Sequence, residues 1–198
     1  MSRICIFGDS IAWGSYESEG GGWADRLKNY YVASDKDVQV YNLGISGDHT
    51  GRLLKRLEVE IKARVPDIII FAIGIRDSQF VHSESNNRIP VDKFRSNLIK
   101  LLQIAQKQTD KIIFVGLTDI DETKTDPIPW NLDESFRTKY ICQYEKIIES
   151  FCNKKDVPII KLTGLIKKED LYDDGLHPNT SGHIKIFEKV RDYLNNVF

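Results

Sequence analysis

Four short motifs, far apart in the chain, carry side chains that could do nucleophilic and acid-base chemistry. They are Gly8-Asp9-Ser10, Asn42-Leu43-Gly44, Gly74-Ile75-Arg76-Asp77 and Asp174-Gly175-Leu176-His177-Pro178. A serine hydroxyl is a weak nucleophile unless a base takes its proton, and that base needs a group that fixes its tautomer and stabilises its charge. Ser10 is the candidate nucleophile, His177 its base and Asp174 the carboxylate that orients His177.

Each motif also has a structural interpretation when it is taken alone. A Gly-Asp-Ser sequence after a strand is a common turn or helix cap. Asp174 and His177 precede a predicted helix, so they could form a capping turn that leaves His177 exposed. Gly44 and Gly47 could serve only a loop that needs positive φ. The occurrence of all four motifs together favours a shared site.

The segments that must position these motifs are short apolar runs that alternate with amphipathic ones. The apolar runs predict strands at 3–7, 38–43, 67–73, 111–117 and 157–162, several of them apolar throughout, as strands buried on both faces are. The amphipathic runs predict helices at about 21–33, 50–64, 91–107, 133–153 and 179–196. We expect an α/β fold over residues 1–198 as one domain: a flavodoxin-like three-layer α/β/α sandwich with a five-stranded parallel sheet.

The predicted sheet places the four motifs at one edge. In open parallel sheets, reactive groups gather beyond the carboxyl ends of the strands. Ser10 follows the first predicted strand, Gly44 the second and Arg76 the third, while Asp174 and His177 follow the fifth. The segment 119–131, which contains two prolines, is the longest irregular stretch and could overhang a pocket at this edge.

Composition narrows the class of partner. Lys and Arg number 28 against 29 Asp and Glu, with both signs mixed along the chain, so we expect no nucleic acid or anionic membrane surface as a partner. A small-molecule substrate is the better expectation. The longest apolar runs fall short of the roughly 20 residues that a membrane span needs. Three cysteines without close spacing indicate reduced thiols, and we expect a cytoplasmic protein.

No cofactor or metal site is expected. His49, His82 and His183 have no acidic partner at a spacing typical of metal ligands. The run of three glycines at 20–22 lacks the lysine and the spacing of a phosphate-binding loop. Phosphoryl transfer through Asp9 is disfavoured because Ile11 stands where a second aspartate is wanted. Ala12 replaces the second glycine of the Gly-x-Ser-x-Gly motif, which argues against the α/β-hydrolase fold.

In this order and near these positions, the four motifs resemble those of the SGNH hydrolases, also called GDSL esterases and lipases, from residue 4 to about residue 190. The resemblance implies a catalytic triad of Ser10, His177 and Asp174. It also implies an oxyanion hole in which the backbone amides of Ser10 and Gly44 are two of three donors. The implied activity is a serine esterase that cleaves a small acyl or acetyl ester through an acyl-enzyme. Substrate identity, acyl-chain preference and oligomeric state stay open.

The third motif departs from the family pattern. The family has Gly-x-Asn-Asp, and its asparagine supplies the third oxyanion donor, whereas this chain has Arg76. Arginine is longer, planar and always charged. Arg76 could donate in or beside the oxyanion hole, bind an anionic substrate, or pair with Asp77 or another carboxylate. It also keeps open a non-enzyme alternative, a catalytically impaired member of the same fold that binds an ester or a sugar-like ligand.

Overall fold

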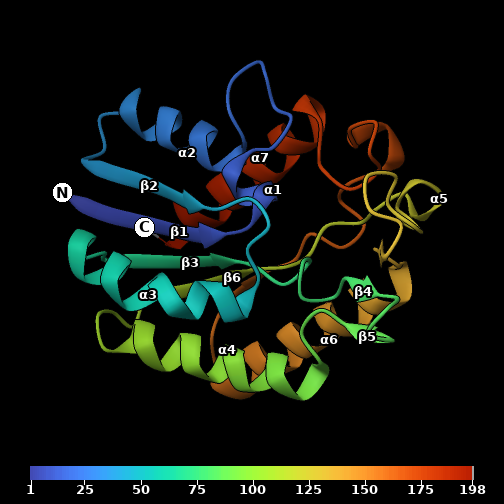
Figure 1. The fold of residues 1–198 in the computed structure, drawn as a ribbon. Coiled ribbons are helices and arrows are strands. Elements are labelled where there is room, and N and C mark those ends of the chain that lie inside the picture. Colours follow the sequence, from blue (N-terminus) through green and yellow to red (C-terminus); the bar gives the residue numbers. More distant parts are fainter. Residues whose placement is uncertain (198) are drawn as a thin grey trace.

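Five parallel strands form the central sheet of the computed structural model, which describes residues 1–197 (Figure 1). They are β1 (Ser2–Gly8), β2 (Val38–Gly44), β3 (Ile68–Ala72), β6 (Ile112–Val115) and β8 (Ile159–Ile160), in the spatial order β2-β1-β3-β6-β8. All pairings between them are parallel. This strand order is the flavodoxin-like one. In that fold the strand order reverses between β1 and β3, and ligands bind at this switch point, beyond the carboxyl ends of the strands. The predicted five-stranded parallel sheet is confirmed.

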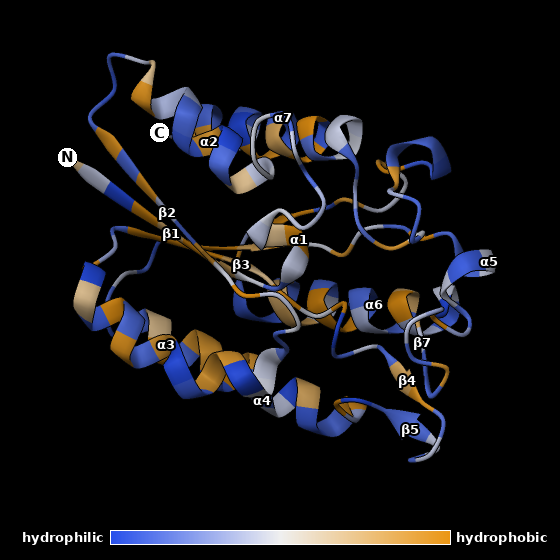
Figure 2. Ribbon diagram, turned by 45° about the horizontal axis from the view of Figure 1, so that its top comes forward, coloured by the Kyte–Doolittle hydropathy of each residue, from blue (hydrophilic) through white to orange (hydrophobic). Residues whose placement is uncertain are grey.

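Helices cover both faces of this sheet. On one face lie α2 (Trp23–Val32) and α7 (Thr180–Val197), and on the other lie α3 (Thr50–Arg64), α4 (Val91–Gln106) and α6 (Thr138–Lys155) (Figure 1). Each helix turns apolar residues towards the sheet, and the strands are apolar along much of their length (Figure 2). In α3, for example, Leu53, Leu57 and Ile61 recur at four-residue steps and are buried. Full burial of such a side chain contributes about 1.5–3 kcal/mol.

The register of the strands brings the motif loops together. Gly8, the last residue of β1, pairs with Gly44 at the end of β2 and with Ala72 at the end of β3. The chain that follows each of these residues therefore leaves the sheet at the same edge. The short helix α1 (Ser10–Trp13) begins there, directly after β1. Residues 4–7 of β1 are buried because helices pack on both faces of this central strand.

A second, small antiparallel sheet differs from the predicted elements. It consists of β5 (Asn86–Asn87), β4 (Phe80–Val81) and β7 (Glu134–Ser135). Because Glu134 and Ser135 pair with β4, the helix predicted from 133 begins only at Thr138. The segment predicted to be irregular contains α5 (Glu122–Thr125). Elements of two to four residues are too short to show a hydrophobic period.

Two further observations concern the whole described chain. None of the helices within residues 1–197 is both long and apolar enough to cross a membrane. The three cysteines are free, with Cys5 and Cys152 buried and Cys142 exposed, as predicted for reduced thiols.

Candidate active site

The three residues expected to form a triad lie in one chain of hydrogen bonds. The Oγ atom of Ser10 lies 2.8 Å from Nε2 of His177, and Nδ1 of His177 lies 2.5 Å from Oδ2 of Asp174. Ser10 comes from the start of α1, whereas the other two residues come from the turn before α7. His177 and Asp174 are buried and Ser10 is partly exposed. The arrangement leaves the hydroxyl accessible while its partners are shielded from water.

The Asp174 carboxylate organises the turn that carries His177. Its Oδ1 atom accepts hydrogen bonds from the amides of Leu176 at 2.9 Å and His177 at 3.0 Å, so that Oδ2 remains for the imidazole. Burial acts to raise the pKa of Asp174, but the hydrogen bonds from His177 and Leu176 outweigh it and hold this pKa below the usual aspartate value. Asp174 therefore keeps its negative charge beside the imidazole at neutral pH.

Two neighbouring segments fix the position of this turn. Asp170 is 2% exposed, and it accepts hydrogen bonds from Ser181 at 2.8 Å and Lys185 at 2.5 Å on α7. On the other side, the amide of Asp121 donates to the carbonyl of Gly175 at 2.8 Å. Gly175 has φ +72°, and a Cβ atom there would lie 2.8 Å from the Cβ of Lys124. The start of the 119–131 segment thus packs against the turn.

The loop between β1 and α1 presents the Ser10 amide. Asp9 caps α1, because its Oδ1 accepts the amide of Ile11 at 3.0 Å. Ser10 is the first residue of the helix, and such residues have no partner for their N–H within it. Burial raises the pKa of Asp9 to about 6. Its role as a cap accounts for Asp9 without a nucleophilic step.

Gly44 lies against α1, and its amide is already hydrogen-bonded. A Cβ atom at this position would lie 2.4 Å from the backbone nitrogen of Trp13, so the close approach requires glycine. The N–H of Gly44 donates to Oδ1 of Asn42 at 3.0 Å, and Nδ2 of Asn42 donates to Asp25 at 3.1 Å. An oxyanion would therefore compete with the Asn42 side chain for this donor.

Arg76 pairs with a carboxylate outside the motif. Its terminal nitrogen Nη2 lies 3.4 Å from Oε2 of Glu134 in β7, and the same carboxylate binds Arg88. The side chain of Arg76 is 27% exposed, yet its Nε atom is buried and has no hydrogen-bond partner among residues 1–197. Of the interpretations left open by the sequence, pairing with Asp77 is wrong and pairing with another carboxylate is observed. The buried Nε leaves one donor of this guanidinium unused.

Asp77, the last residue of the third motif, has a structural position. It is fully buried and accepts hydrogen bonds from the amide of Thr50 at 3.0 and 3.1 Å and from the hydroxyl of the same residue. It therefore holds the first residue of α3 to the loop after β3. Burial raises the pKa of Asp77 to about 7.

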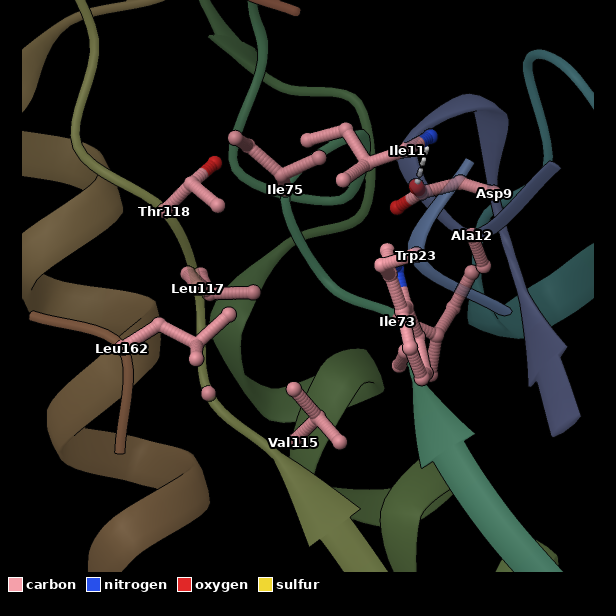
Figure 3. A pocket seen from close by; sticks show the side chains of 12 residues that line it. Asp9, Ile11, Ala12, Trp23, Ile73, Ile75, Val115, Leu117, Thr118 and Leu162 are labelled. Carbon is pink, nitrogen blue, oxygen red and sulfur yellow. Dashed lines mark hydrogen bonds between the residues drawn. The ribbon is translucent and has the colours of Figure 1, made fainter. Parts of the chain in front are cut away.

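A small cavity of about 20 Å³ lies at the ends of β1, β3 and β6 (Figure 3). Asp9 and Ile11, the neighbours of Ser10 in the chain, line it. Its lining is mostly apolar, and Ile11, Ile75 and Leu117 line it beside Asp9. The hydroxyl of Thr118 also lines the cavity and is buried without a hydrogen-bond partner. A volume of this size admits about one water-sized group.

Sequence reasoning missed a pair of aromatic residues beside the triad. The rings of Tyr16 and Tyr172 stack at 4.5 Å, and Tyr16 meets His177 edge-on at 5.2 Å. Tyr16 is 55% exposed and has φ +64°, a backbone conformation that is rare for a bulky side chain. The available signal was an aromatic residue six positions after Ser10 that belongs to no apolar stripe.

Comparison with known proteins identifies the family. The model of the GDSL-like Lipase/Acylhydrolase family matches residues 6–184, which is most of the chain. The chain belongs to this family. The resemblance to the SGNH hydrolases is thereby confirmed, and the protein is a GDSL-type carboxylic ester hydrolase.

Relatives of this GDSL protein include two esterases and a lipase/acylhydrolase of known structure. An arylesterase of Vibrio mimicus is 24% identical over 192 residues, which cover 97% of this chain and 88% of that protein. An isoamyl acetate-hydrolyzing esterase of Schizosaccharomyces pombe is 25% identical over 196 residues, covering 96% and 74%. The crystal structure of a lipase/acylhydrolase from Enterococcus faecalis superimposes with a TM-score of 0.81 at 25% identity, covering 99% of this chain and 96% of that one.

Proposed function

We propose that the protein hydrolyses small acyl or acetyl esters through an acyl-enzyme formed on Ser10, with His177 as general base and acid and Asp174 as its orienting carboxylate. The observation that carries this proposal is the 2.8 Å separation of Ser10 Oγ and His177 Nε2. Asp174 accepts a hydrogen bond from the N–H at Nδ1, so Nε2 of the neutral imidazole has a free lone pair for the serine proton.

The reaction follows from this tautomer. His177 Nε2 takes the proton of Ser10 as Oγ attacks the ester carbonyl, and the carbonyl oxygen becomes an oxyanion. When the bond to the alcohol breaks, the alcohol leaves with the proton from Nε2, and the acyl group stays on Oγ. Water then gives a proton to His177, attacks the acyl carbon and releases the acid as the proton returns to Oγ. Asp174 keeps its negative charge throughout and stabilises the imidazolium.

Three donors would stabilise the oxyanion. The Ser10 amide is available because it begins α1. The Gly44 amide would exchange Asn42 Oδ1 for the substrate oxygen. We assign the third donor to Nε of Arg76, which is buried and unpartnered while Glu134 holds the far end of the guanidinium. Fixed donors aimed at developing charge are commonly the largest single contribution to such catalysis.

The small acyl group is supported by the cavity that Asp9 and Ile11, the chain neighbours of Ser10, line. A volume of about 20 Å³ accepts a methyl group, whereas a longer chain requires Ile75, Leu117 or their neighbours to move. One relative is named for hydrolysing isoamyl acetate, an ester with the same small acyl group. Acetate esters are therefore the substrates to test first.

The experiment compares Ser10→Ala with a matched control. Ser96 lies on α4, away from the triad, so Ser96→Ala removes a hydroxyl of the same kind. We expect Ser10→Ala to lower hydrolysis of p-nitrophenyl acetate by about 10⁴-fold or more and to abolish labelling by a fluorophosphonate, with Ser96→Ala unchanged in both. Folded wild-type protein that neither turns over esters nor takes the label would support the impaired, ligand-binding alternative.

A further inference from the structure

Two arginines near the loop that follows β3 are paired with a single carboxylate. Arg76 and Arg88 share the carboxylate of Glu134, at 3.4 Å for Arg76 and in a closer contact for Arg88. The amide of Gln79 also donates to Glu134 at 2.9 Å. The single negative charge of Glu134 thus faces the two positive charges of Arg76 and Arg88, which leaves an excess of positive charge.

Arg52 adds a third positive charge without a counterion. It lies in the first turn of α3, and a Cβ atom on Gly47 would lie 3.9 Å from its Nη1 atom, so it lies next to the loop that follows Gly44. Within residues 1–197 its guanidinium has no ion pair or hydrogen bond. The nearby carboxylate of Asp48 binds Arg56 at 2.8 Å instead.

The charges act on one another across the site. Burial lowers the pKa of Arg76; Glu134 raises it, and Arg88 and Arg52 lower it further. The pKa of His49 is lowered by burial and then by Arg52 and Arg88. The Asp9 carboxylate, next to Ser10 in the chain, is also among the charges that act on Arg76. The positive field therefore reaches the edge of the sheet where the triad lies.

We propose that the natural substrate is an ester whose alcohol part carries an anionic group, a carboxylate or a phosphate, held by Arg52 and attracted by the charge of Arg76 while the ester lies at Ser10. Guanidinium groups match the planar geometry of these anions. The anion belongs to the alcohol part because the cavity of about 20 Å³ leaves no room for it on the acyl side. This inference rests on the proposed esterase function and specifies its substrate.

The test uses two substrates whose alcohol parts differ in charge. Their leaving groups also differ in acidity, so the readout is the change of the ratio between wild type and variants, in which that difference cancels. The ratio of kcat/KM for p-acetoxybenzoate to kcat/KM for its neutral methyl ester measures the preference for the anion, and p-acetoxyphenyl phosphate measures the preference for phosphate. We expect a ratio above one that falls about threefold in Arg52→Gln and about tenfold in Arg52→Glu, and that Arg52→Lys retains. It should also fall as salt rises from about 0.01 M to about 1 M, because the screening length shortens from about 30 Å to about 3 Å.

The matched control is Arg95 on α4, an exposed arginine that likewise has no ion pair, so Arg95→Gln should leave the ratio unchanged. Binding of benzoate and of inorganic phosphate to folded Ser10→Ala protein, measured by calorimetry, separates the two proposals. Anion binding that weakens in Ser10→Ala/Arg52→Glu, together with a folded wild-type protein that shows no esterase activity, would overturn the esterase function alone. Esterase activity with a ratio of one or less, insensitive to Arg52 and to salt, would overturn the anion site.

Discussion

The guanidinium of Arg76 and the carboxylate of Glu134 lie 3.4 Å apart, which ties the loop after β3 to the small sheet. Arg76 is partly buried, so its contact with Glu134 limits the directions in which its other N–H groups can point. Glu134 holds a terminal nitrogen, and Nε stays buried and unpartnered nearer the backbone. The pair therefore orients Arg76 as well as neutralising part of its charge.

Arg76→Ala tests the assignment of Nε as an oxyanion donor. We expect kcat and kcat/KM for neutral acetate esters to fall together, by about 2.7–4 kcal/mol on the transition-state scale, with little change in KM. Arg76→Asn should recover part of this loss, since an asparagine amide is the donor in the family pattern. Steady-state kinetics on both variants supply the measurement. Rates within about twofold of wild type in Arg76→Ala would leave Arg76 a structural role only.

Asp174→Asn tests the orientation of the base. An amide at this position can donate to Nδ1, which would place the imidazole proton on Nε2 and block proton transfer from Ser10. We expect kcat to fall by as much as about 10⁴-fold while the protein stays folded. Asp173 is exposed and adjacent, so Asp173→Asn is the matched control and should keep wild-type kinetics. Equal activity in the two variants would contradict the triad.

Ile75→Val tests the cavity as the determinant of acyl length. Removing one methyl group from its lining should raise kcat/KM for p-nitrophenyl butyrate relative to the acetate, at a cost of about 0.5–1.5 kcal/mol in the free energy of unfolding. Ile99→Val, an exposed position on α4, is the control for the same change of side chain. An unchanged ratio of butyrate to acetate in Ile75→Val would mean that the acyl group lies elsewhere.

Asp77→Asn tests the buried carboxylate through the pH dependence of stability. Burial raises the pKa of Asp77 to about 7, whereas an aspartate in the unfolded chain titrates near 3.9, so between about pH 4 and about pH 7 the folded protein holds a proton that the unfolded chain has lost. The contribution of Asp77 to the free energy of unfolding therefore falls as pH rises through this window, by at most about 1.4 kcal/mol per unit.

Asparagine at position 77 removes this titration. The free energy of unfolding of each protein is measured by urea denaturation. As pH rises from about 4 to about 7, the value for the wild type should fall relative to the value for Asp77→Asn, and above about pH 7 the difference should become constant. Asp9 titrates in both proteins, but its charge acts on Asp77, so the difference measures Asp77 together with its coupling to Asp9. A difference independent of pH would show that Asp77 does not titrate in this window.

Much of the fold and the meeting of Ser10 with His177 could be predicted from the sequence. The apolar runs are long enough to show that the strands are buried on both faces, and parallel strands place their carboxyl ends at one edge. Ser10 and Asp174 each follow such a strand in the chain, so their proximity depends on topology rather than on the detail of packing. The family motifs pointed to the same residues.

Only the tertiary structure decided the partners of individual side chains. Glu134 lies in a two-residue strand that exists because it pairs with β4, and no local pattern predicts so short an element. The partner of Arg76 therefore could not be read from the chain, and the same holds for Asn42, whose side chain occupies the amide of Gly44. The volume of the cavity at the strand ends also depends on how residues from several distant segments pack, a property of their summed contacts rather than of any one motif.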